Sequence, residues 1–232
     1  MILGTLLLSI PLVQGSLQEV RDARSGLRFL RLFESISPVL HAARAERGRT
    51  VLAMTSGDPD DREAVLERRA ETDRALAALN GVLERDRPEV FAEFRENHAT
   101  LGTLRERAFR SGEDVLAVMD GYSGVIAAGS QRLAIASAGL RDPDLRTLAL
   151  SMLLIDQAAE HLGRERALVS RALALRSVAR DAVHPALREG ELAELALSLT
   201  ATQMPPERTD DLRALRDGPV GARVRAHREH LQ

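Results

Sequence analysis

The chain has 232 residues, enough for one large domain or two small helical bundles, and its net charge is −2. All 32 basic residues are arginine and are interleaved with acids, which argues against a nucleic-acid-binding surface. The absence of cysteine excludes disulfides, thiolate chemistry and Cys-ligated zinc.

The first 14 residues are uncharged and mostly apolar. They are fewer than the roughly 20 residues that span a bilayer, and they lack the basic start and small-residue cleavage site of a signal peptide. We therefore expect residues 1–14 to be the end of a transmembrane helix, or else a buried N-terminal helix, ahead of one all-helical domain at 15–232. The transmembrane alternative implies a membrane anchor with the domain on the extracytoplasmic (periplasmic) side.

The rest of the chain reads as a series of helices, because apolar residues make up 44% of it and aromatic residues only 3%. Turn residues divide it into expected helices at 15–37, 38–54, 60–87, 88–110, 113–140, 143–180, 185–204 and 206–230. Ser37-Pro38 either restarts or kinks the first helix, and Asp142-Pro143 supplies an N-cap with proline at the first helical position. Short connections predict an all-α, antiparallel up-and-down arrangement, most simply two four-helix bundles that share long helices.

Two arginines occupy positions where the helical pattern predicts core residues. The stripes are Ile36, Leu40, Ala43, Thr50 and Met54 in one helix, and Leu148, Met152, Ile155, Ala159, Leu162, Val169 and Leu173 in the other. Their spacing of three and four residues places Arg47 and Arg166 on the inner faces. Each follows a glutamate and precedes a small residue, Gly48 or Ala167, which would let another helix approach closely.

A guanidinium that faces a core needs an acidic partner, because an unpaired buried charge costs several kcal/mol. That partner could be internal, and Asp73 is the best candidate because it shares a stripe with Leu66 and Arg69. The chain would then be a structural or protein-interaction bundle. Alternatively, one carboxylate is too few for Arg47, Arg69 and Arg166, and a bound planar anion would suit the arginine fork.

Several segments resemble the nitrate- and nitrite-sensing (NIT) domain over roughly residues 35 to 225. They are the Glu-Arg-Gly helix at Leu40–Met54, the segment Arg69–Leu79, the tyrosine segment around Tyr122, Val125 and Ile126, the Gly-x-Glu-Arg-Ala block at Leu153–Ser170, and Gly218-Pro219-Val220. The resemblance implies an all-helical sensor domain of a bacterial signal-transduction receptor. Its partners would be nitrate or nitrite and a downstream output domain or receptor partner.

The resemblance also implies which residues bind the anion. The arginines of the motifs correspond to Arg47 and Arg166, with Arg44 and Arg164 as further candidates. A C-terminal arginine of the family could be any of Arg208, Arg213, Arg223 and Arg225. We expect no enzymatic activity, metal, cofactor or nucleic-acid partner, and the sequence leaves open whether the domain forms a homodimer.

Overall fold

The computed structural model describes residues 2–86, 99–176, 180–204 and 209–210. In these ranges the chain is all-α and contains no strand, which confirms the predicted class. The long helices are α1 (Ile2–Ser56), α2 (Pro59–Asp86), α4 (Val115–Ala138), α5 (Pro143–Ala174) and α6 (Arg180–Gln203). A shorter helical segment covers residues 99–107.

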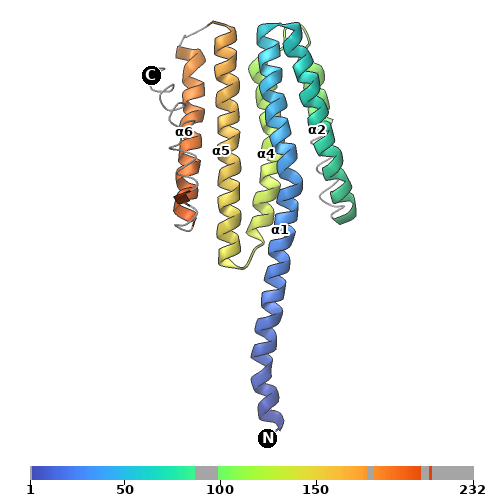
Figure 1. The fold of residues 1–232 in the computed structure, drawn as a ribbon, viewed down its shortest axis with the longest axis vertical. Coiled ribbons are helices and arrows are strands. Elements are labelled where there is room, and N and C mark those ends of the chain that lie inside the picture. The colour runs from blue at the N-terminus through green and yellow to red at the C-terminus, as the bar shows by residue number, and fades with distance from the viewer. Residues whose placement is uncertain (1, 87–98, 177–179, 205–208, 211–232) are drawn as a thin grey trace.

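The helices pack side by side with antiparallel neighbours, and the N-terminal half of α1 extends beyond the bundle (Figure 1). Helix α1 contacts α2, α4 and α5, and α5 also contacts α4 and α6. Helices α1 and α5 run in the same direction, so residues later in α1 lie beside residues later in α5. The division into two four-helix bundles depends in part on residues outside the described ranges and stays a prediction.

The expected restart or kink at Pro38 does not divide the first helix, because α1 continues as one helix of 55 residues. Proline removes a backbone donor and disfavours a helix interior. Here Ile36 and Leu40, on either side of Pro38, are both buried in the same apolar cluster. Packing of these flanking residues holds the helix together where local preference would interrupt it.

The later boundaries follow the turn residues more closely. Asp142 caps α5 by accepting from the amide of Leu145, and Pro143 occupies its first turn, as predicted. Helix α5 ends at Ala174, six residues before the predicted end, and α6 begins at Arg180 with a proline inside it. Residues 87–98 and most of the predicted helix 206–230, with its four candidate arginines, lie outside the described ranges.

The stripe predicted for α1 is confirmed. Ile36, Leu40 and Ala43 are buried, and Arg47 is fully buried in the position that the pattern assigned to it. The surrounding cluster combines α1 with Leu76 of α2 and with residues from the segment 99–107 and from α4. The buried face of α1 therefore consists of apolar residues together with one charged residue, Arg47.

The stripe predicted for α5 is wrong. Leu148, Ile155 and Leu162 are exposed, whereas the buried positions of this helix are Ala149, Ser151, Asp156, Ala158, Gly163, Ala167, Leu168 and Ala172. Most of these side chains are small, and small side chains allow neighbouring helices to approach closely. Close packing of neighbouring helices, rather than the size of the apolar residues, therefore determines which face of α5 is buried.

The stripe predicted for α2, which also included Leu76, is wrong in part: Leu76 is buried, but Leu66 and Asp73 are exposed, and Val65 and Thr72 are buried instead. Asp73 pairs with Arg105, so it is not the internal partner of Arg47. Among the described residues, no helix combines the length and apolar character that a membrane crossing requires. The division of the chain at residue 14 stays a prediction.

Candidate anion-binding site

The Glu-Arg pair of α1 separates two polar networks. Glu46 and Arg47 are both 0% exposed. Adjacent residues of an α-helix point about 100° apart, so the two side chains face different neighbours. Arg47 reaches towards α4 and α5, whereas Glu46 reaches towards α2, α4 and the segment 99–107.

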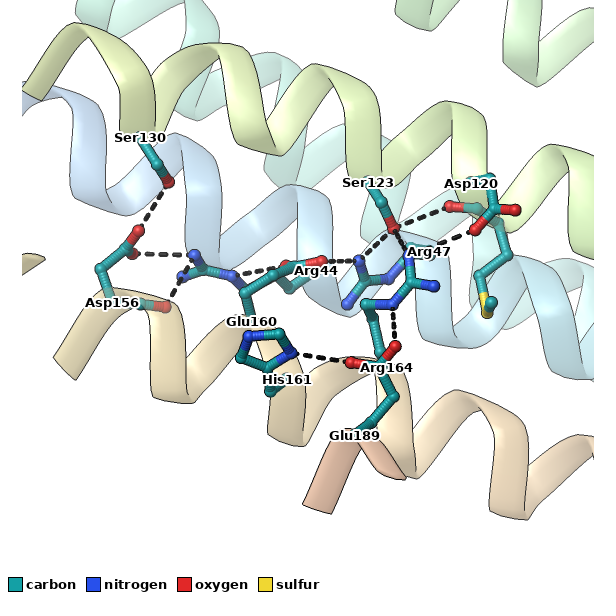
Figure 2. Close-up of polar contacts among 11 residues, drawn as sticks. Arg44, Arg47, Asp120, Ser123, Ser130, Asp156, Glu160, His161, Arg164 and Glu189 are labelled. Atoms are coloured by element: carbon teal, nitrogen blue, oxygen red, sulfur yellow. Dashed lines mark hydrogen bonds and ion pairs between the residues drawn. The ribbon is translucent and has the colours of Figure 1, made fainter. Parts of the chain in front are cut away.

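Arg47 has a partly satisfied guanidinium. Its Nη1 donates to Ser123 Oγ at 2.8 Å and to Glu160 Oε1 (Figure 2). Its Nε and Nη2 are buried and have no hydrogen-bond partner within the described residues. Burial lowers the pKa of Arg47, an effect that Glu160 opposes and the nearby Arg44 and Arg164 reinforce. The side of the fork formed by Nε and Nη2, which suits two oxygens of one planar anion, therefore has no acceptor within the described residues.

Gly163 of α5 lies close to Arg47 Nη2. A Cβ added at Gly163 would come within 2.9 Å of Arg47 Nη2 and within 3.9 Å of Arg44 Cβ. The glycine of the Gly-x-Glu-Arg-Ala block therefore makes room for a guanidinium from another helix. Gly48, by contrast, has no atom within 4 Å of an added Cβ, so the small residue after Arg47 is not required for close packing.

Arg44 lies one turn before Arg47 in α1, and its side chain contacts the same face of α5. Its Nη2 pairs with Asp156 Oδ1 at 2.8 Å and donates to the Asp156 carbonyl at 3.2 Å. Its Nε donates to Glu160 Oε2 at 3.1 Å. Asp156 also accepts from Ser130 of α4 at 2.6 Å. The sequence placed Arg44 near this site, and the structure confirms that position.

Arg164 approaches from α5 and shares Ser123 with Arg47. Its Nη1 donates to Ser123 Oγ at 2.8 Å, and its Nε donates to Glu189 Oε1 of α6 at 2.8 Å (Figure 2). His161 lies 2.8 Å from the other oxygen of Glu189. Burial alone would lower the pKa of Arg164, but the bonds and charges of Glu189 outweigh it and raise that pKa. One hydroxyl therefore holds two guanidinium groups side by side.

Arg166 is exposed, so the expectation that it faces the core beside Arg47 is wrong. Residues two apart point to different sides of a helix, and here Arg164 takes the inner position. Arg166 instead lines an open groove of about 660 Å³ between α1 and α5. Arg44, Arg49 and Gly163 line the same groove. Three of the four predicted arginines, Arg44, Arg47 and Arg164, thus form one interior cluster. Arg166 lies outside this cluster, in the groove.

The second network surrounds Glu46. This carboxylate accepts from Arg105 Nε at 2.7 Å, from Arg105 Nη2 at 2.9 Å and from the Tyr122 hydroxyl at 2.7 Å. Arg69 Nε lies 3.9 Å from Glu46, and its guanidinium is 5.3 Å from the Phe109 ring. Arg69 therefore belongs to the Glu46 network, not to a site shared with Arg47 and Arg166 as the sequence suggested.

Sequence reasoning missed Ser123, Asp156, Glu160 and Glu189, which are partners of the inner arginines. A signal was present, because Asp156, Glu160 and Gly163 recur at helical spacing on one face of α5. Ser123 follows the tyrosine that the resemblance singled out. Assigning the inner face to the largest apolar residues of α5 concealed this pattern.

Neither a curated protein nor a solved structure matches the chain significantly. A family model described as "Nitrate and nitrite sensing" matches residues 38–231. This range contains α1 from Pro38 onward and every residue of the arginine cluster. The chain belongs to the NIT family of nitrate- and nitrite-sensing domains.

Proposed function

We propose that this sensor domain binds nitrate or nitrite between α1, α4 and α5, with Arg47 as the principal donor. Arg44 and Arg164 flank it, and Arg166 contributes positive charge at the groove outside. Membership of the family supplies the sensory function, and the arginine cluster supplies the mechanism that we propose for it.

The two buried donors of Arg47 that have no partner within the described residues, Nε and Nη2, carry the proposal. A buried donor without an acceptor costs about 1–3 kcal/mol. A planar anion could offer one oxygen to Nε and one to Nη2, which would recover this loss. Lysine could not replace Arg47 in this role, since a point charge lacks the paired donors. The groove is lined by Gly163 and Arg44, which are both neighbours of Arg47, so we propose that the anion enters from this groove.

Binding would also change how α5 is held. Arg47 and Arg44 attach α5 to α1, and Arg164 attaches it to α6 through Glu189. An anion that prefers one arrangement of these contacts shifts the population towards it. Because α1 is a single helix that extends beyond the bundle, an offset or tilt at Arg47 could pass along it to an output domain (Figure 1).

The remaining features of this proposal rest on the sequence. Membrane attachment and an extracytoplasmic position are supported by the apolar residues that open α1. A role in sensing rather than catalysis is supported by the family. We propose that the output lies in a separate domain or receptor partner. If the chain forms two four-helix bundles, the second bundle could relay the helix offset or tilt to that partner.

Thermal unfolding with and without nitrate tests the proposal. A ligand at 100 times its Kd stabilises by about 2.7 kcal/mol, which corresponds to a rise in Tm of roughly 5–10 °C for a domain of this size. We expect Arg47→Lys to lose this rise and Arg105→Lys, which alters only the Glu46 network, to keep it. Equal melting of the wild type with and without millimolar nitrate would contradict the proposal.

The competing function is a structural or interaction bundle, and the ion pairs of Arg44 and Arg47 with Glu160 favour it. Arg47→Ala distinguishes the two. In a purely structural clasp this substitution lowers stability by a few kcal/mol whether or not nitrate is present. In the sensor it also removes the stabilisation that nitrate gives to the wild type.

A further inference from the structure

We propose that the Glu160 carboxylate is an internal occupant of the anion site, which nitrate or nitrite must displace from Arg44 and Arg47. The inference rests on the proposed function and adds to it a residue that sets affinity and releases α5. Glu160 lies outside the Glu-Arg motifs on which the sequence interpretation depends.

The position of Glu160 is that of a ligand. Its Oε1 accepts from Arg47 Nη1 and its Oε2 accepts from Arg44 Nε at 3.1 Å, so one planar group bridges two guanidinium groups (Figure 2). Carboxylate and nitrate are both planar oxyanions that accept from arginine forks. An incoming anion that binds Nε and Nη2 of Arg47 would therefore compete with Glu160 for the charge of the same guanidinium.

The charges in the cluster require one carboxylate to leave. Three cations, Arg44, Arg47 and Arg164, face three buried or half-buried carboxylates: Asp156, Glu160 and Glu189. With His161, the other partner of Glu189, counted as neutral, these charges cancel before an anion binds, and the exposed Asp120 beside Arg164 only adds negative charge. An added anion would leave an uncompensated buried charge unless a carboxylate moved into solvent.

Glu160 is the carboxylate that can leave. Its side chain is 18% exposed, whereas that of Asp156 is 5% exposed and is also held by Ser130. Glu189 is held by His161 as well as by Arg164. In the part of the chain that the structure describes, Glu160 hydrogen-bonds to Arg44 and Arg47 alone, so leaving costs it no further contact.

Displacement explains how binding would become a signal. Glu160 belongs to α5 and both of its partners belong to α1, so it ties the two helices together. A free anion pairs with the same guanidinium, that of Arg47, without being attached to α5. Exchange of one for the other would therefore weaken a direct link between the helices while keeping the arginines paired.

Calorimetric titration of nitrate into wild type and Glu160→Gln tests this inference. The amide is neutral and competes poorly for two arginines. If Glu160 occupies the site nine-tenths of the time, its removal tightens the apparent Kd about tenfold. Glu191→Gln, which removes an exposed carboxylate from α6, should leave the affinity unchanged.

The outcomes separate this inference from the proposed function. Wild-type binding that is unchanged or weakened in Glu160→Gln overturns the inference and leaves the proposed function standing. Absence of binding in both proteins overturns both. Binding by Glu160→Gln alone would support the inference, because the internal carboxylate would then exclude the anion.

A second variant gives a readout that does not depend on the wild-type affinity. Glu160→Ala leaves Arg44 and Arg47 short of an acceptor and should melt earlier than the wild type. We expect nitrate or formate to restore its Tm more than chloride at equal ionic strength, because both are planar oxyanions. Equal effects of the three salts would count against an anion-shaped position at Glu160.

Discussion

Arg47 of α1 and Gly163 of α5 lie close together across the interface that holds the arginine cluster. The contact leaves no room for a methyl group, since a Cβ at Gly163 would lie 2.9 Å from Arg47 Nη2. Arg47 cannot withdraw freely, because its Nη1 is bound to both Ser123 and Glu160. The glycine and the arginine therefore form one packing unit, although they are more than a hundred residues apart.

Gly163→Ala should consequently displace the Arg47 side chain. Overpacking of this kind costs about 1–3 kcal/mol, partly offset by the better helix propensity of alanine. We expect a net loss of stability in urea unfolding and a weaker response to nitrate. Gly48→Ala is the matched control, and should gain roughly 0.5–1 kcal/mol because its added Cβ meets no atom. Equal gains in both variants would show that the contact is not restrictive.

Tyr122→Phe tests whether the Glu46 network is independent of the anion site. The phenol donates to Glu46 at 2.7 Å, and burial and the Glu46 charge raise the pKa of Tyr122. Removing a bond to a buried charge should cost about 1.5–3 kcal/mol. The rise in Tm caused by nitrate should persist. Loss of that rise would mean that Glu46 and Arg47 act together.

The contact between α5 and α6 should depend on pH through Glu189. Burial alone would raise the pKa of this carboxyl, but hydrogen bonds from His161 and Arg164 outweigh it and lower that pKa. A lowered pKa in the folded state contributes stability above the unfolded pKa of about 4.3, and loses it as pH falls through the folded value. The stability difference between wild type and Glu189→Gln should thus be largest near neutral pH and shrink in acid. A difference that grows in acid would mean that folding raises the pKa of Glu189 rather than lowering it.

The start of α5 provides a prediction that the sequence alone could make. Asp142 accepts from the Leu145 amide at 2.9 Å ahead of a proline in the first turn. Asp142→Ala should cost about 1 kcal/mol, while Asp142→Ser should retain most of the stability. Chemical unfolding of the two variants measures the difference, and identical losses would show that the cap contributes little.

Local signals of this kind predicted much of the fold. The cap at Asp142 and the inner face of α1, including Arg47, follow from neighbouring residues and helical spacing. The break predicted at Pro38 does not occur. Ile36 and Leu40, on either side of the proline, are buried in the core cluster, and this tertiary packing cannot be read from local preference.

The site was harder to predict because α5 has two faces with the same period. Leu148, Ile155 and Leu162 are large and exposed, whereas Ala149, Asp156 and Gly163 are seven residues apart and buried. Residue hydrophobicity favours the first face, and close approach of neighbouring helices selects the second. Because the wrong face of α5 was predicted to be buried, Arg166 was placed in the interior. For the same reason Glu160, the carboxylate that pairs with Arg47, was not recognised.

The paired donors of Arg47 should bind a planar anion. Calorimetric titration of the wild type and Arg47→Lys against nitrate, nitrite, chloride and sulfate tests it most directly. The account predicts saturable binding of nitrate or nitrite by the wild type, weaker binding of chloride and sulfate, and loss of nitrate and nitrite binding in a folded Arg47→Lys protein. Undiminished nitrate binding by Arg47→Lys, or no preference among the four anions, would contradict it.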